Sequence, residues 1–289
     1  MLPLLRKDRL KVQKLPTDYN HFRTLITYDN LTVFNGVTAF TSTREGGVST
    51  GANYATLNLG NFSDDKAENI RNNQDILCRQ LGISRKCLIN AHQRHTANVR
   101  IIDQDFLSLS DTEKKERLEG VDALVSDCSD ICLTVTTADC VPILLFDPQK
   151  QALAAIHSGW RGTVQNILYN TVHTLITTYN SKPHNLYGVI GPHISAEVYA
   201  VGSDVREAFE TADRRYTSFF SPQPQHPNHF LLNLSGIIQF QISNCGIPAK
   251  NIHLSPLCTF SRPDLFFSAR RDSVHSGRML SGILKRSDS

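Results

Sequence analysis

The sequence lacks the features that mark membrane, nucleic-acid-binding and fibrous proteins. Its 289 residues contain no apolar run near the roughly 20 residues that a transmembrane helix needs. With 30 basic and 27 acidic side chains the net charge is only +3, and no tract is strongly basic. No compositional bias typical of collagen, coiled coils or disorder is present. We therefore expect a globular protein that binds neither membranes nor nucleic acid.

The sequence also gives no sign of secretion. Met1–Leu5 is apolar for five residues before charges begin, whereas the apolar part of a signal peptide needs about 7–15. The chain has seven cysteines, an odd number, which favours reduced thiols over a set of disulfides in a chain of this size. We expect a cytoplasmic protein in which most cysteines are small buried side chains.

The pattern of apolar residues predicts an α+β fold with mixed, largely antiparallel sheets and flanking helices. No repeat or long flexible linker divides the chain, so we predict a single domain. Polar segments 108–119 and 221–229 should be surface loops, the first alternatively a short solvated helix. Apolar periodicity or alternation predicts helices over 64–81, 162–179, 205–212 and 234–245, and strands over 131–137, 141–146 and 152–157. The strand over 141–146 is continuously apolar, as in a strand buried on both faces.

A hairpin around the turn at 147–151 brings a cysteine close to a histidine. In that pairing Cys140 lies opposite His157 or one residue away from it. Facing side chains have Cβ atoms about 4.5–5.5 Å apart. The pair is half of a metal site or a catalytic dyad, or else a core cysteine beside a structural histidine.

A third ligand would favour a metal, because catalytic zinc sites use three Cys, His or carboxylate ligands and keep one position open. His92 or His95, in the segment His92-Gln-Arg-His95, can supply it. The flanking residues look extended, so the two side chains should point to opposite faces and only one should bind the metal.

Two turns that contain arginine are candidates for binding an anion. Gly159-Trp-Arg-Gly162 leads into the predicted helix over 162–179, and a helix N-terminus beside Arg161 suits an anion. Alternatively, Gly162 only allows a sharp turn. Arg44 precedes Gly46-Gly47 and either binds an anion or lies on the surface of a hairpin turn.

Several motifs follow one another over most of the chain. The strongest are Thr137-Ala-Asp-Cys140 and His157-Ser-Gly-Trp-Arg-Gly162. The others are Ser42–Ser49, Leu57–Gly60, Gln93–His95, Asp122–Leu124, Ile190–Pro192, Cys258-Thr259, Phe266–Ser268, Arg270–Asp272 and Gly277-Arg278. From about Thr41 to Ile283 the chain thus resembles the YfiH/YlmD-like laccase-domain family. Its members are described as purine nucleoside phosphorylases and include the peptidoglycan editing factors.

The resemblance implies a YfiH-like catalytic domain over 41–289, preceded by a lead-in segment over 1–40. It also implies a zinc ion held by His95, Cys140 and His157, which selects His95 over His92. Two positions depart from the family pattern: Arg94 stands where valine is usual, and Ala269 where tyrosine is common.

The implied activity is phosphorolysis of adenosine, inosine and methylthioadenosine to the free base and a pentose 1-phosphate, with adenosine deamination as a second activity. Zinc can lower the pKa of water for attack on adenine, or orient phosphate beside Arg44 and Arg161. Cys140 and His157 are the catalytic candidates at the metal. Asp139 either assists an oxocarbenium-like state at the sugar or orients a ligand histidine.

Three alternatives use the same residues differently. A metal-free amidohydrolase for peptidoglycan precursors would use Cys140 as nucleophile and His157 as base, but would leave His95 without a role. A copper-dependent polyphenol oxidase is disfavoured because none of the 11 histidines forms an H-x-H pair, although copper can occupy a His/Cys/His site. A binding module without activity would leave the whole cluster unused.

Overall fold

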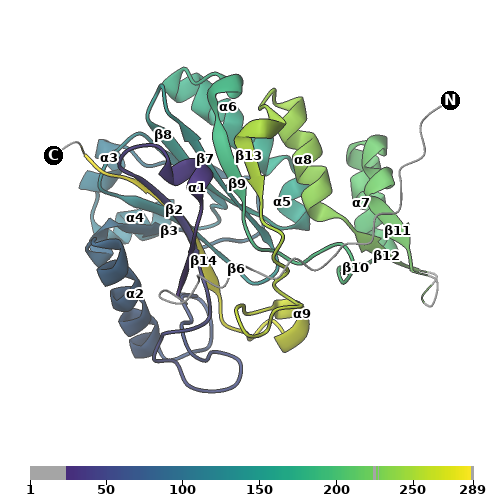
Figure 1. Cartoon of the computed structure of the whole chain (residues 1–289), viewed down its shortest axis with the longest axis horizontal. Coiled ribbons are helices and arrows are strands. Elements are labelled where there is room, and N and C mark those ends of the chain that lie inside the picture. Colours follow the sequence, from purple (N-terminus) through teal and green to yellow (C-terminus); the bar gives the residue numbers. More distant parts are fainter. Residues whose placement is uncertain (1–23, 224–225, 227, 288–289) are drawn as a thin grey trace.

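Two stacked β-sheets form the centre of the protein in a computed structural model that describes residues 24–223, 226 and 228–287 (Figure 1). The larger sheet has six strands in the order β13-β9-β7-β8-β5-β4. In chain order they are β4 Val99–Ile101, β5 Ala123–Ser126, β7 Val141–Asp147, β8 Ala152–Ser158, β9 Tyr187–Ile190 and β13 Ile252–Leu254. The inner pairs are antiparallel and the two outermost pairs are parallel.

The second sheet has five strands in the order β1-β2-β14-β6-β3, and only the β3–β6 pair is parallel. Its strands are β1 Leu25–Thr27, β2 Val37–Ser42, β3 Leu88–Asn90, β6 Cys132–Thr137 and β14 Met279–Lys285. β1 and most of β2 fall within the lead-in predicted over 1–40. The described part of that segment is therefore an integral part of this sheet, because β2 pairs with both β1 and β14.

Helices cover the outer face of each sheet. Alternate residues of β7 face opposite ways: Ile143 packs with helices α6 (Ile167–Tyr179) and α8 (Leu234–Asn244), whereas Leu144 packs against the five-stranded sheet. Helix α2 (Ala67–Leu81) covers the far face of that second sheet (Figure 1). β7 is thus buried on both faces, as its continuous apolar run predicts.

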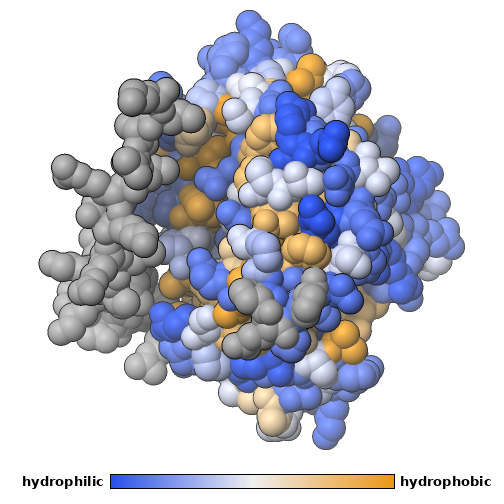
Figure 2. Space-filling view, turned by 90° about the vertical axis from the view of Figure 1, so that its right-hand side faces the viewer, coloured by the Kyte–Doolittle hydropathy of each residue, from blue (hydrophilic) through white to orange (hydrophobic). Residues whose placement is uncertain are grey.

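A third, three-stranded sheet lies at one end of the molecule with helix α7 (Ser203–Ala212) (Figure 1). It is formed by β10 Ala200–Gly202, β11 Phe220–Pro222 and β12 His229–Leu232. Outside the grey atoms, this end is mainly hydrophilic (Figure 2). The remaining short elements are α1 Asp29–Thr32, α3 Gln104–Ser108, α4 Asp111–Arg117, α5 Trp160–Val164, α9 Ala269–Asp272, η1 Arg85–Cys87, η2 Pro183–Asn185, η3 Arg214–Phe219 and η4 Ala249–Asn251.

The predicted fold class is confirmed, with two local corrections. The helix expected over 162–179 is split into α5 and α6 because Asn166 between them has left-handed backbone angles (φ 62°). The loop expected over 221–229 contributes residues to β11 and β12. Segment 108–119 contains the solvated helix α4, which begins with a capping box. None of the described helices is both long and apolar enough to span a membrane.

Candidate metal centre

Three potential metal ligands meet where the chain leaves the sheets. His95 lies between β3 and β4, Cys140 between β6 and β7, and His157 near the end of β8. Cys140 Sγ and one nitrogen of each histidine all lie within 4.8 Å of one another, and Sγ is 3.7 Å from His95 Nε2. Within the described residues, no other group of three His, Cys, Asp or Glu side chains has this geometry.

The β7–β8 hairpin has a different register from the one predicted. His157 pairs with Pro142, so Cys140 precedes β7 and is not opposite His157. Asp139 takes a left-handed conformation (φ 95°) in the turn between β6 and β7. Cys140 and His157 are therefore brought together by this turn and not by a facing position in the ladder.

His92 and His95 have separate roles, although neither lies in a strand. His92 Nδ1 is 2.5 Å from Glu119 Oε2, and its ring stacks on Phe62 with centroids 3.5 Å apart. His95, with left-handed backbone angles (φ 60°), is exposed and joins Cys140 and His157. The geometry therefore makes the choice that the spacing left open.

Asp122 holds two of the three potential ligands, and no sequence pattern gave it a role. It is 1% exposed, and its Oδ1 accepts hydrogen bonds from His157 Nδ1 (2.7 Å) and from the backbone N–H of His95 (3.0 Å). Its Oδ2 accepts from the backbone N–H groups of Arg94 and Thr96. The only signal for it was its place in the motif Asp122–Leu124, because nothing local relates it to a histidine 35 positions later.

The charges of these groups stabilise a deprotonated thiol. Burial raises the pKa of Cys140, but His157, assisted by His95, brings it below its ordinary value. Burial lowers the pKa of His157, but Cys140 and Asp122 raise it above its ordinary value. Burial likewise works against ionised Asp122, yet hydrogen bonds from His157 and the backbone lower its pKa to about 2. With Nδ1 of His157 committed to Asp122, Nε2 is the nitrogen available for a ligand.

Glycine is needed beside this cluster for steric reasons. A Cβ atom at Gly159 would lie 2.8 Å from His95 Cδ2 and 3.0 Å from Cys140 Sγ. Two imidazoles and a thiolate form a donor set that zinc prefers, with room for one further ligand. These three residues therefore fit the metal that the resemblance implies.

The cluster opens into a cavity of about 360 Å³. Residues from five regions of the chain line it: Gly60–Ser63; His92, Gln93 and His95; Thr136–Ala138 with Cys140; His157; and Ala269, Val274 and Arg278. A volume of this size is typical of a small-molecule site. Arg278, quoted above only as part of a motif, lines the cavity while its guanidinium donates to Val274 O and Ser276 Oγ.

Comparison with known proteins identifies the family. A sequence model described as "Multi-copper polyphenol oxidoreductase laccase" matches residues 38–286. The chain belongs to this laccase-domain family. It is 36% identical over 260 residues to a purine nucleoside phosphorylase of Bacteroides thetaiotaomicron, covering 90% of this chain and 96% of that protein.

Two further laccase-domain relatives extend the comparison. The protein named adenosine deaminase RL5, from an unknown prokaryotic organism, is 34% identical over 252 residues, covering 87% of this chain and 95% of that protein. The crystal structure of a Bacillus licheniformis hypothetical protein YfiH superimposes with a TM-score of 0.83 at 27% identity. That match covers 92% of this chain and 98% of the other.

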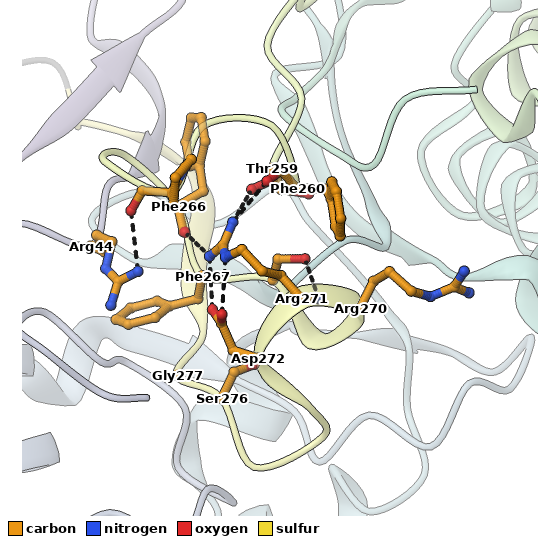
Figure 3. Close-up of polar contacts among 12 residues, drawn as sticks. Arg44, Thr259, Phe260, Phe266, Phe267, Arg270, Arg271, Asp272, Ser276 and Gly277 are labelled. Carbon is orange, nitrogen blue, oxygen red and sulfur yellow. Dashed lines mark hydrogen bonds and ion pairs between the residues drawn. The ribbon is translucent and has the colours of Figure 1, made fainter. Parts of the chain in front are cut away.

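In this laccase-domain protein the carboxylate of Asp139 is fully engaged away from the histidines. It is 7% exposed and accepts hydrogen bonds from Thr259 Oγ1 (2.6 Å), Ser268 Oγ (2.9 Å) and the backbone N–H of Arg270 (2.7 Å). Arg271 in turn fixes Thr259 by donating to its carbonyl (Figure 3). The carboxylate that contacts His157 is that of Asp122, and not that of Asp139 as the sequence allowed.

The two predicted anion-binding arginines lie outside the lining of the metal cavity. Arg44 donates to the carbonyls of Ala55, Pro263 and Ala52, and its guanidinium is 4.6 Å from the centroid of the Phe267 ring. Figure 3 shows it beside Phe266 and Phe267.

Arg161 lies in a separate hollow of about 630 Å³ together with Tyr199 and Arg270. It is exposed and lies over the Trp160 ring, 4.3 Å from the centroid. We find no hydrogen bond or ion pair to its guanidinium from any residue that the structure describes.

Proposed function

We propose that this protein is a zinc-dependent purine nucleoside phosphorylase that acts in the cytoplasm. It would convert adenosine, inosine and methylthioadenosine to the free base and a pentose 1-phosphate, with adenosine deamination as a second activity. The main support for this proposal is the His95–Cys140–His157 cluster, which opens into a cavity of small-molecule size. Relatives of the chain are named purine nucleoside phosphorylase and adenosine deaminase.

Each residue of the cluster has a defined task in this proposal. His95, Cys140 and His157 would hold the zinc, and Asp122 would fix the tautomer and orientation of His157. When bound, zinc would supply a Lewis acid that polarises an oxygen of phosphate or water. In phosphorolysis a phosphate oxygen bonds to C1′ as the C1′–N bond breaks, and the base leaves with a proton on its ring nitrogen.

The contacts of Asp139, Arg44 and Arg161 favour a different role for each side chain in the proposed reaction. The three hydrogen bonds to Asp139 favour a positioning role, in which it holds the turn that presents Cys140. The guanidinium of Arg161 lies over the Trp160 ring but makes no hydrogen bond or ion pair with the described residues, which favours it as a phosphate ligand. The three carbonyl contacts of Arg44 favour a structural role for that side chain.

Metal analysis combined with a phosphate-dependent assay tests the proposal. We expect about one zinc per chain in the purified protein, and release of hypoxanthine from inosine only when phosphate is present. Cys140→Ala should lose both the zinc and the activity. A zinc-free protein that is silent toward inosine, but loses another activity when its thiol is alkylated, would overturn the proposal.

A metal-free cysteine amidohydrolase of peptidoglycan precursors is the second candidate, because Asp122 contacts His157 and a His157 nitrogen lies within 4.8 Å of Cys140 Sγ, the order of a catalytic triad. It predicts that His95→Ala keeps the activity, whereas the zinc enzyme would lose it. A copper-dependent oxidation needs further copper centres, and the described residues contain one donor group of this kind. Equilibrium with equal zinc and copper, followed by metal analysis, would show which ion these three ligands retain.

A further inference from the structure

Exposed apolar side chains gather at the mouth of the metal cavity. Among the described residues seven large apolar side chains are exposed: Val33, Val48, Phe62, Tyr169, Ile176, Leu254 and Val274. Two of the seven, Phe62 (57% exposed) and Val274 (72% exposed), line the cavity that holds the Cys140 cluster. They come from different loops, which are more than 200 residues apart in the chain.

Phe62 is backed by a second ring and is still more than half exposed. Its ring stacks on the ring of His92 with an interplanar angle of 16°. His92 is itself fixed by Glu119, which also accepts a hydrogen bond from Arg94 Nε at 3.0 Å. The exposed face of Phe62 is therefore a supported flat surface that can stack on a second planar ring.

The two loops that carry Phe62 and Val274 are tied together. His275 Nδ1 lies 2.5 Å from Asp64 Oδ2, which joins the loop after Val274 to the loop after Phe62. A second connection is made by Arg278, which donates through its backbone N–H to Asn58 Oδ1 and through its guanidinium to Val274 O. The positions of the two apolar side chains are thus coupled, although each side chain is exposed.

We infer that Phe62 and Val274 form a clamp for the purine base of the nucleoside. This inference rests on the proposed function and assigns the part of the cavity that recognises the base. A flat heteroaromatic base stacked on Phe62 and covered by Val274 would leave its sugar toward the metal ligands. Stacking tolerates different substituents on the ring, so the clamp accepts adenine and hypoxanthine alike.

Steady-state kinetics with inosine and phosphate test the clamp. Phe62→Ala should raise the KM for inosine about tenfold or more, leave the KM for phosphate within about twofold, and keep the zinc content of the wild-type protein. Phe62→Tyr should restore the wild-type KM, because it retains the ring. Tyr169→Ala is the matched control, since Tyr169 is equally exposed (57%) but lies on α6 outside the cavity lining.

Calorimetric titration with inosine separates failure of the clamp from failure of the proposed function. If the wild-type protein does not release hypoxanthine, the proposed phosphorolysis is wrong, while inosine binding that is lost in Phe62→Ala and kept in Phe62→Tyr still supports the clamp. If Phe62→Ala binds and turns over inosine like the wild type, or if the wild type binds no inosine, the clamp is wrong. Circular dichroism and zinc analysis show whether each variant is folded and loaded.

Discussion

The two sides of the metal cavity differ in how their residues are held. On the side formed by the sheets, Asp122, Asp139 and His157 are 1%, 7% and 3% exposed, and each carboxylate accepts at least three hydrogen bonds. On the side formed by loops, Phe62 and Val274 are more than half exposed. They are supported by a ring stack, the His275–Asp64 contact and the hydrogen bonds of Arg278.

The difference follows from the interactions that each side has to make. Metal coordination depends on the direction of lone pairs, so ligands have to be fixed by a saturated hydrogen-bond network. Stacking on a flat ring depends mainly on contact area, so an exposed side chain with one supported face is sufficient. Substitutions on the sheet side should therefore act on the metal, and substitutions on the loop side should act on the substrate.

The largest expected effect is on zinc content, and it should distinguish His95 from His92 in the same loop. His95→Ala removes one of the proposed ligands, and we expect loss of zinc and of zinc-dependent activity, with the fold kept because His95 is exposed. His92→Ala removes the support of Phe62 and the contact with Glu119 but no proposed ligand, so zinc should remain at about one per chain. Metal analysis of both variants checks this, and zinc retained by His95→Ala but lost by His92→Ala would reverse the assignment.

Asp122→Asn should weaken zinc binding about 10- to 100-fold, because an amide cannot provide the charge that orients and polarises His157. Competition with a chromogenic chelator measures the affinity. Asp147→Asn is the control, since Asp147 is also a buried carboxylate that accepts backbone N–H bonds, but from the turn at the far end of β7. Equal zinc affinities in the two variants would contradict the role given to Asp122.

Gly159→Ala should displace His95 and Cys140, because the new Cβ would lie within about 3 Å of both side chains. We expect zinc affinity to fall with little loss of thermal stability. Gly51→Ala provides the opposite case: its Cβ would meet nothing within 4 Å, but φ is 95°, so stability should fall by about 1–3 kcal/mol while zinc affinity stays unchanged. If Gly159→Ala binds zinc like the wild type, a methyl group at position 159 can be accommodated without displacing His95 or Cys140.

The smallest effect should come from the His275–Asp64 pair at the rim, whose side chains are 64% and 72% exposed. Exposed ion pairs contribute about 0–1 kcal/mol, so Asp64→Asn should change the free energy of unfolding by less than about 1 kcal/mol. Urea denaturation measures it. A loss above about 2 kcal/mol would mean that the rim is held as firmly as the sheet side.

Local sequence patterns were sufficient to predict many of the helices and strands. Helix α2 ends at Gly82 in the left-handed conformation, as expected of a glycine after an amphipathic run. The apolar run over 141–146 became the doubly buried β7. The break in the helix over 162–179 was missed because its apolar stripe continues across Asn166, and asparagine adopts left-handed angles without a clear signal in its neighbours.

The candidate site was harder to predict from the sequence than the fold. The motifs named His95, Cys140 and His157. The predicted hairpin placed Cys140 opposite His157 or one residue away, whereas His157 pairs with Pro142, two residues after Cys140. No local pattern relates Asp122 to His157. That partnership exists because β5 and β8 are neighbours in one sheet.

By itself, the sequence determined the α+β class, the helices and strands with strong apolar patterns and, through its motifs, the three candidate ligands. The fold elements depend on side chains close together in the chain, where spacing and backbone preference decide the outcome. The three ligands, in contrast, are implied by the family that the motifs resemble. The tertiary structure alone decided that the ring of His92 stacks on Phe62, and that Asp139 is bound by Thr259 and Ser268. Thr259 and Ser268 are 120 or more positions from Asp139, and only the packing of the two sheets and their loops brings them together.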